Sequence, residues 1–309
     1  MKALLALALA ATLGAEVRIT QPPLGLDLYM PVPVSNPMTS EKVARGRKLF
    51  FDKRLSRDGT LSCASCHDPK LSFAEERALA VGIGSAVGTR NSPSLINRGY
   101  GSSFFWDGRA DSLEELALEP IFNPKELGNS REELERRTEM SAPEVATALA
   151  SYMRTIRSGD SRFDRYTAGQ TLALNALEKE GLKVFRGTGG CANCHPGPNF
   201  TDERFHNTGV AWRDDHLEDE GRFAVSEIAR DRGAFKTPTL RDLTRTAPYM
   251  HNGSLATLED VVEFYSRGGR QNPTLDPLIK PRDLTPQEKL ALVSFLKTLT
   301  GRTEEGVLH

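Results

Sequence analysis

Apolar residues recur three or four positions apart in five segments of the chain, as they do along one face of an α-helix. Ser141 and Thr285 stand just before two of these segments and suit N-caps, because a hydroxyl there accepts a hydrogen bond from the first turn. Between the segments, Gly, Pro and Asn gather around two cysteine motifs. The pattern predicts a mainly α protein, with helices over 41–51, 143–156, 172–185, 258–265 and 286–299.

The first residues form a separate segment. Met1 and Lys2 precede an apolar run from Ala3 to Leu13, which is typical of a secretory signal peptide over residues 1–15. The run is too short to span a bilayer, and no later stretch approaches about 20 apolar residues, so the sequence predicts no membrane span. Residues 16–39 are rich in proline and are expected to form an extended N-terminal arm.

Length and charge restrict the classes of function. The chain has 309 residues, which is enough for two compact domains. Its net charge of −1 gives no electrostatic reason to expect binding to nucleic acid or to an anionic membrane surface.

All four cysteines of the chain lie in two copies of one motif, Cys-x-x-Cys-His. This spacing is the attachment signature of c-type haem, in which each thiol forms a thioether with the porphyrin and the histidine binds iron. A zinc site would not need a histidine after each cysteine pair, and structural disulfides are the other alternative. The sequence predicts two covalent haems, held by Cys63, Cys66, Cys191 and Cys194, with His67 and His195 on the irons. Because such haem is attached after export, the signal peptide and the motifs together predict a bacterial periplasmic protein.

The two halves of the chain resemble each other beyond the haem motifs. A Gly-x-x-x-Phe precedes each motif, at Gly46 and at Gly181, and the run 93–95 (Pro-Ser-Leu) is matched by 238–240 (Pro-Thr-Leu). The later pair is farther apart than the two motifs are, which indicates loop insertions of different length. We therefore expect two cytochrome c-like haem domains related by internal duplication.

The histidine positions distinguish the two irons. The segment between His67 and His195 contains no histidine, and only Met140 and Met153 offer thioethers. Met153 falls on the apolar face of a predicted helix, where a core role is expected. We therefore expect an open first iron, where a small oxidant such as hydrogen peroxide would bind, and a second haem that relays electrons. A nearby carboxylate would move the proton of the peroxide, and the candidates are Asp107, Asp111, Glu114, Glu115, Glu119 and Glu126.

Several motifs resemble those of the bacterial di-haem cytochrome c peroxidases, a superfamily that includes the MauG proteins of methylamine utilisation. The resemblance extends over residues 40 to 300 and is carried by the segments 50–56, 63–67, 90–93, 105–109 and 247–251. It implies a peroxidatic haem domain over 40–165 and an electron-transfer haem domain over 166–309.

The resemblance also implies roles for individual residues. The catalytic glutamate of the family falls on Glu126, and the tryptophan that lies between the two haems falls on Trp106. A calcium site between the domains would take the side chain of Asn91 and the main-chain oxygens of Thr246 and Pro248, and oxygen donors suit Ca²⁺.

Three positions depart from the pattern of the well-known peroxidases. Ile83 stands where many members carry a histidine that blocks the reaction haem, and Leu116 replaces a distal glutamine. Tyr265 stands where peroxidases supply methionine to the second haem, and tyrosine at this position is similar to MauG. Alternatively, Tyr265 is an aromatic side chain that packs on the edge of the haem. In that case His251 or His206 would be the ligand of the second iron.

The resemblance implies a periplasmic di-haem c-type peroxidase that reduces hydrogen peroxide to water with electrons from a small cytochrome c or a cupredoxin. Cleavage would give Fe(IV)=O at the first haem, and electrons would arrive through the second. The alternative is a MauG-like enzyme that uses peroxide to oxidise Trp or Tyr side chains of a partner protein, a post-translational modification. A di-haem electron carrier without enzyme activity would need strong ligands on both faces of both irons, which the missing histidine argues against. The resemblance is compatible with a homodimer.

Overall fold

The computed structural model describes residues 21–306. The signal peptide predicted over 1–15 therefore lies outside the described residues, as does the start of the predicted arm. The α-helices of the described part are α1 (Ser40–Phe50), α2 (Leu113–Phe122), α3 (Arg131–Thr138), α4 (Ala142–Arg154), α5 (Arg162–Thr167), α6 (Ala176–Arg186), α7 (Phe223–Ser226), α8 (Leu258–Ser266) and α9 (Pro286–Lys297). Its strands are β1 (Arg157–Gly159), β2 (Phe205–His206), β3 (Trp212–Arg213), β4 (His216–Leu217), β5 (Phe235–Lys236) and β6 (Arg302–Glu304).

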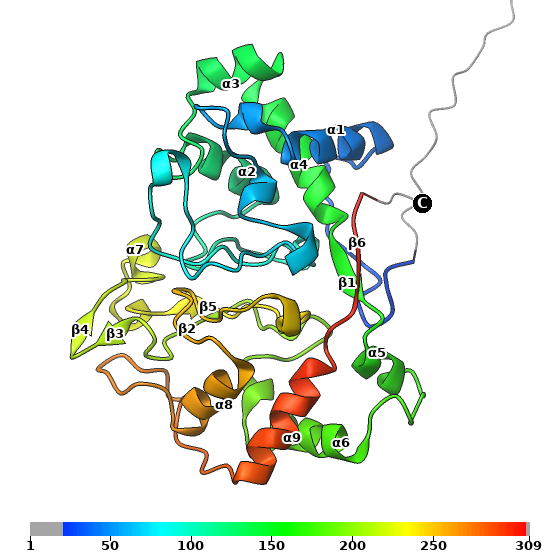
Figure 1. Ribbon diagram of the computed structural model, residues 1–309, viewed down its shortest axis with the longest axis vertical. Helices are drawn as coiled ribbons and strands as arrows, with labels where there is room; N and C mark the ends of the chain where they lie inside the picture. The colour runs from blue at the N-terminus through cyan, green and yellow to red at the C-terminus, as the bar shows by residue number, and fades with distance from the viewer. Residues whose placement is uncertain (1–20, 307–309) are drawn as a thin grey trace, which may run out of the picture.

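Two groups of helices occupy opposite ends of the molecule (Figure 1). The first group, α1 to α4, surrounds a buried apolar cluster that includes Phe50 and Leu149. The second group, α6, α8 and α9, surrounds another cluster that includes Phe185 and Phe295. Phe163 of α5 belongs to the second cluster. The described residues thus bury two apolar cores, one at each end.

The same close helix crossing occurs in both groups. A Cβ atom at Gly46 of α1 would collide with the carbonyl oxygen of Ala148 in α4, and a Cβ atom at Gly181 of α6 would collide with that of Ala291 in α9. Glycine is required at both crossings because only a residue without a side chain lets the two backbones approach so closely.

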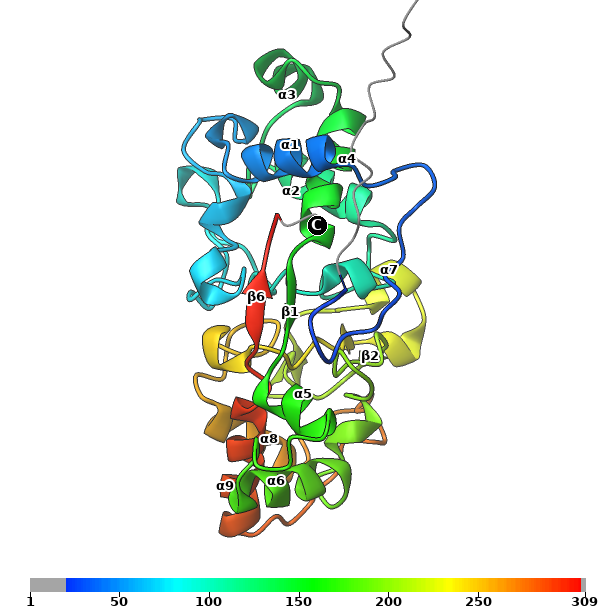
Figure 2. The same cartoon turned by 90° about the vertical axis from the view of Figure 1, so that its right-hand side faces the viewer.

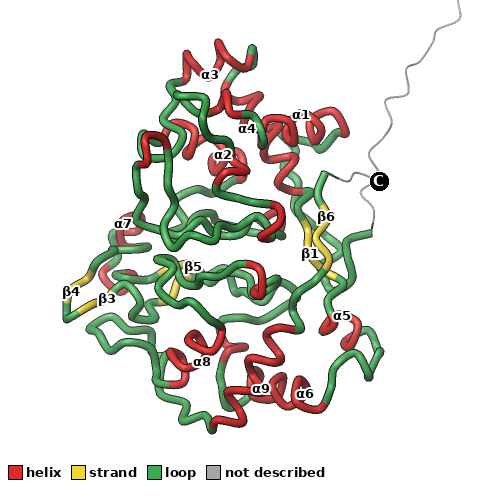
Figure 3. Tube along the Cα trace, viewed as in Figure 1, coloured by secondary structure: helices red, strands yellow, loops and turns green. Residues whose placement is uncertain are grey.

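Loops and very short strands fill the space between the two groups of helices (Figure 3). β2 pairs with β5 and β3 pairs with β4, both antiparallel. Each of the two cysteine motifs begins as a 3₁₀ turn, Cys63–Ser65 and Cys191–Asn193. Irregular backbone of this kind is what a flat cofactor needs around it.

Segments near both ends of the chain connect the two groups. β6 follows α9 and pairs antiparallel with β1, which follows α4 (Figure 2). Glu305 then reaches α1, where its Oε1 lies 2.9 Å from Nη2 of Arg47. On the N-terminal side, residues 21–39 contain turns but no helix or strand, and the Gly25 carbonyl oxygen accepts a hydrogen bond of 2.7 Å from Arg241.

The structure confirms a helix-rich fold and contains all five predicted helices, and Ser141 and Thr285 are N-caps as expected. One boundary was wrong: α6 begins at Ala176, not at Leu172, because the Asn175 side chain caps it by accepting a hydrogen bond of 3.0 Å from the Glu178 N–H. Of the other four helices in the described part, α2 holds three of the carboxylate candidates, Glu114, Glu115 and Glu119, and α3, α5 and α7 were missed because they are short and α3 is mostly charged. Among the described residues, no helix is long and apolar enough to cross a membrane.

Candidate functional site

The histidines of the two motifs make the same contact. Nδ1 of His67 lies 3.1 Å from the carbonyl oxygen of Phe73, and Nδ1 of His195 lies 2.8 Å from that of Phe200. A hydrogen bond to a carbonyl keeps the proton on Nδ1 and leaves Nε2 for a metal ion. Burial lowers the pKa of both histidines to about 4, so both rings are neutral, as a metal ligand must be.

A cavity of about 270 Å³ lies against the second motif. Cys191, Cys194 and His195 form part of its wall, and apolar side chains such as Phe185 and Val262 form much of the rest. No disulfide joins any of the four cysteines. An apolar cavity that presents two thiols and a neutral imidazole fits a covalently attached haem.

Tyr265 of α8 lines the same cavity and lies near both thiols of the second motif. Burial raises the pKa of its phenol above the ordinary value. His251 also lines the cavity, but its ring is stacked on Phe235 with 3.6 Å between the ring centroids. Tyr265 thus lies near the two thiols, whereas the ring of His251 packs against Phe235.

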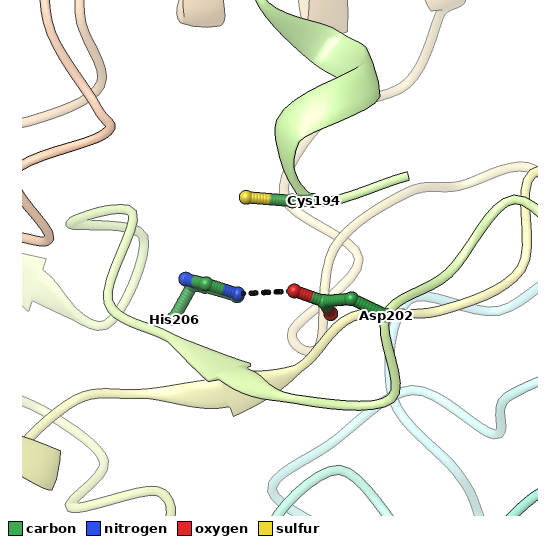
Figure 4. Close-up of side chains that lie close together, drawn as sticks. All are labelled: Cys194, Asp202 and His206. Carbon is green, nitrogen blue, oxygen red and sulfur yellow. Dashed lines mark hydrogen bonds and ion pairs between the residues drawn. The ribbon is translucent and has the colours of Figure 1, made fainter. Parts of the chain in front are cut away.

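His206 is held between two carboxylates. Its Nδ1 lies 2.7 Å from Oδ2 of Asp276, and its Nε2 lies 3.0 Å from Oδ2 of Asp202. Figure 4 shows the ring beside Cys194 and Asp202, a cluster whose ligand atoms lie within 4.8 Å of one another. This spacing suits a metal ion, but a thioether to haem would remove the thiol of Cys194 as a metal ligand.

Glu126 lies in the turn after α2, beside the first motif. Asn123 donates a hydrogen bond of 2.8 Å from Nδ2 to Oε1 of Glu126, and burial raises the pKa of the Glu126 carboxyl. Burial, followed by the charges of Glu75 and Glu126, raises the pKa of Cys66 to about 11. Glu126 therefore lies close enough to the first motif for its charge to affect a thiol there.

The other carboxylates that the sequence offered are engaged or exposed. Glu126 has no ion-pair partner among the residues of the described range, which distinguishes it from three of the other candidates. Ion pairs hold Asp107, Glu114 and Glu119, whereas Asp111 and Glu115 are exposed at the start of α2.

Ile83 packs directly against the turn that carries Glu126. The Ile83 N–H donates a hydrogen bond of 2.9 Å to the carbonyl oxygen of Glu126, and a Cβ atom at Gly128 would collide with Cδ1 of Ile83. The Ile83 side chain is buried and carries no atom that binds iron. Leu116 lies at the edge of the first apolar core and can donate no hydrogen bond from its side chain to peroxide.

Trp106 is bonded to both halves of the molecule. Its indole Nε1 donates a hydrogen bond of 2.8 Å to the Asn91 carbonyl oxygen, and its own carbonyl oxygen accepts one of 2.8 Å from the Lys236 N–H in β5. The Asn91 N–H in turn donates to the carbonyl oxygen of His251, at 2.7 Å. These three bonds hold the indole at the junction of the two groups.

The residues expected to bind calcium lie near this junction. Asn91, Thr246 and Pro248 all line the cavity described above. The Asn91 side chain donates from Nδ2 to the Arg77 carbonyl oxygen, at 2.8 Å, and its Oδ1 accepts no hydrogen bond from the part of the chain that the structure describes. The amide orientation thus presents an oxygen of the kind that calcium prefers.

Sequence reasoning missed Arg90 as a link between the two halves. Its guanidinium lies 2.6 Å from Oδ2 of Asp107, next to Trp106, and makes two bonds of 2.8 Å to Asp219 in the second half. Bidentate pairs of this kind fix geometry as well as charge. Arg90 lies in the segment 90–93, which carries part of the family resemblance. Nothing in the sequence marks Asp219, 129 positions away, as its partner.

Two haem motifs, each with a buried histidine held through Nδ1, define a protein that carries two c-type haems. A family profile described as di-haem cytochrome c peroxidase matches residues 40–172. The methylamine utilization protein MauG of Methylorubrum extorquens is 41% identical over 288 residues, which are 87% of this chain and 81% of that protein. The cytochrome-c peroxidase IdrP1 of Denitromonas iodatirespirans is 35% identical over 334 residues, or 93% and 88%. This chain belongs to the di-haem cytochrome c peroxidase family.

Solved structures agree with this assignment. A MauG-like protein associated with microbial copper homeostasis has a TM-score of 0.83 and 35% identity, with 89% of this chain and 95% of that chain covered. The diheme peroxidase BthA of Burkholderia thailandensis has a TM-score of 0.72 at 24% identity, with 93% and 94% covered, and shows a likeness of fold alone.

Proposed function

We propose that this protein reduces hydrogen peroxide to water with electrons from a small cytochrome c or a cupredoxin, and that peroxide reacts at the first haem. The observation that carries the proposal is the unpaired carboxylate of Glu126 beside the first motif, next to Ile83, which offers no ligand to block the iron. Haem iron, when bound, supplies the position where peroxide is held and the electrons that break its O–O bond.

The protein residues around the first haem then have distinct tasks. Glu126 takes the proton from the near oxygen of peroxide and delivers it to the far oxygen, which leaves as water. The raised pKa of Glu126 suits this exchange, because the group must both accept and return a proton. Asn123 holds Oε1, so that Oε2 is available to peroxide.

Cys63, Cys66, Cys191 and Cys194 are the proposed attachment points of the haems, and His67 and His195 their proximal ligands. Trp106 is proposed to carry electrons between the haems, which its bonds to both halves support. We assign Tyr265 as the second ligand of the second iron, where an anionic oxygen favours the oxidised metal.

The remaining assignments concern the architecture. We propose that 40–165 and 166–309 are haem domains that arose by internal duplication, which the matched glycine crossings of α1 with α4 and of α6 with α9 support. One Ca²⁺ would join them through Asn91, Thr246 and Pro248. Residues 1–15 would direct the protein to the periplasm, where a small redox protein would meet it.

A second function is favoured by one observation. Tyr265 lines the cavity of the second motif, as a MauG-like enzyme requires, and a MauG protein is 41% identical to this chain. In that case the electrons come from Trp or Tyr side chains of a partner protein.

Steady-state peroxide consumption distinguishes the two functions. The purified holoprotein is mixed with peroxide and reduced small cytochrome c, and separately with each candidate protein substrate. Sustained oxidation of the cytochrome supports the peroxidase. Slow cytochrome turnover together with a mass change on a Trp or Tyr of a partner overturns it in favour of protein modification.

A further inference from the structure

Lys236 is a buried cation in the wall of the cavity at the second motif. It ends β5 and is 7% exposed. Its ammonium group donates a hydrogen bond of 3.2 Å to the carbonyl oxygen of Thr237 and lies 3.4 Å from Oε1 of Glu203. Glu203 is its only ion-pair partner within residues 21–306.

Glu203 is already fully engaged with another cation. Arg98, which is also buried, donates from Nη1 to Oε1 at 2.9 Å and from Nη2 to Oε2 at 3.1 Å. Arg98 and Lys236 therefore share the carboxylate of Glu203, and Asp202 is a second acid close enough for its charge to act on Lys236. Burial first, and then the charge of Arg98, lower the pKa of Lys236 to about 7, against the opposing effect of the Glu203 and Asp202 carboxylates.

A second cation on the same cavity wall shows the balanced arrangement. Arg241 is buried and makes two bonds to Asp164, of 2.9 and 3.0 Å. Buried charges are normally paired one to one in this way, because an unpaired charge in a protein interior is unstable. Lys236, by contrast, has no carboxylate of its own and lines the cavity, so an anion among the contents of the cavity could pair with it.

We propose that Lys236 binds a propionate carboxylate of the second haem. This inference rests on the proposed seating of that haem in the cavity. Haem carries two carboxylates and is the one anionic group that the thioether motif brings there. The backbone N–H of Lys236 donates to the Trp106 carbonyl oxygen, so Lys236 would hold the propionate from a strand that is bonded to the first half of the molecule.

The charge of Lys236 has a redox consequence. A cation beside the porphyrin stabilises the ferrous form, which carries one positive charge fewer, and therefore raises the reduction potential. It opposes the anionic Tyr265, which lowers that potential. The negative charge of Glu203 lowers the reduction potential of the second haem, opposite to the effect of Lys236.

Spectroelectrochemical titration of charge variants tests the proposal. Lys236→Met removes the charge but keeps an unbranched side chain that is one atom shorter, and it should lower the potential of the second haem without changing that of the first. Lys236→Arg should keep the wild-type value. At a pH well below 7, where Lys236 stays protonated without Glu203, Glu203→Gln should shift the potential upward. The matched control is Lys289→Met, which removes a second-half lysine paired with Glu263 outside the cavity.

The direction of the two shifts separates electrostatics from structural damage. Damage to the cavity would shift the reduction potential of the second haem in the same direction in Lys236→Met and Glu203→Gln, which would overturn the proposal. A charge effect shifts the two potentials in opposite directions. Resonance Raman spectra supply a second readout, because loss of the cation should shift the propionate bending mode of the second haem only. Unchanged potential and bending mode in Lys236→Met would also overturn the proposal.

A haem count separates this inference from the one on which it depends. The thioethers retain the haem in every variant, so a pyridine haemochrome assay should give two haems per chain. If the wild type holds a single haem, the seating itself fails. If it holds two and Lys236→Met behaves as wild type, only the role of Lys236 fails.

Discussion

Replacing Glu126 by glutamine should slow the cleavage of peroxide while leaving the fold and both haems intact. Gln matches Glu in shape and retains an oxygen that can accept the 2.8 Å hydrogen bond from Asn123. No ion pair is lost, because Glu126 makes none within the described residues. Burial raises the pKa of Glu126, so its ionised form lowers the stability of the folded state above that pKa, and the neutral amide relieves this cost.

The expected loss of rate follows from the role of the group. General acid–base catalysis contributes about 10²–10⁴ in rate, which corresponds to about 3–5 kcal/mol in the barrier. The matched control is Glu119→Gln, which breaks a partly exposed pair with Arg109 and should cost at most about 1 kcal/mol of stability and little rate. Stopped-flow absorbance at the Soret band, after mixing the ferric protein with peroxide, measures the cleavage step.

The pH dependence provides an independent check. Glu126 accepts a proton only when ionised, and its pKa is raised, so the wild-type rate should fall as the pH falls through that raised pKa. The Gln variant should lack this dependence. Cleavage by Glu126→Gln at close to the wild-type rate, with the same pH profile, would refute the assignment, and a slow Glu119→Gln would then identify Glu119 as the proton carrier.

Three further predictions concern the haems and the residues between them. The ferric protein should bind cyanide without prior reduction, because Ile83 offers no ligand; a wholly low-spin resting spectrum that ignores cyanide would contradict this. Tyr265→Phe should remove the low-spin electron paramagnetic resonance signal of the second haem, and Tyr265→Met should raise its potential in a redox titration; an unchanged signal in the Phe variant would place the ligand elsewhere. Arg90→Met should slow electron transfer between the haems, measured by transient absorption, but not peroxide cleavage, because it loses its bonds to Asp107 and Asp219. Equal slowing of both steps would show a general loss of structure.

The sequence was sufficient to predict helices and their caps, because a local pattern of residues determines these local structures. Helical spacing predicted the main helices, and a hydroxyl before an apolar run predicted the caps at Ser141 and Thr285. It failed at the start of α6, where Leu172 continues the apolar pattern but the chain is exposed and Asn175 caps the helix instead.

Contacts between distant segments were beyond such reasoning. Six carboxylates were candidates for the proton carrier, and only the ion pairs of the folded chain distinguish Glu126 from Asp107, Glu114 and Glu119. The carboxylate that Lys236 shares with Arg98 likewise depends on Arg98 and Glu203 meeting across the two halves. Such pairs leave no periodic trace in the sequence, because each partner looks like an ordinary surface charge.

Peroxide is expected to remove two electrons from this protein, and an external donor is expected to return them. The most direct test is to treat the ferric holoprotein with one equivalent of peroxide, remove the excess with catalase, and titrate with reduced small cytochrome c. The account predicts that two molecules of cytochrome are oxidised per protein and that the resting spectrum returns. A protein that oxidises no cytochrome after peroxide, or that releases oxygen from peroxide instead, would contradict it.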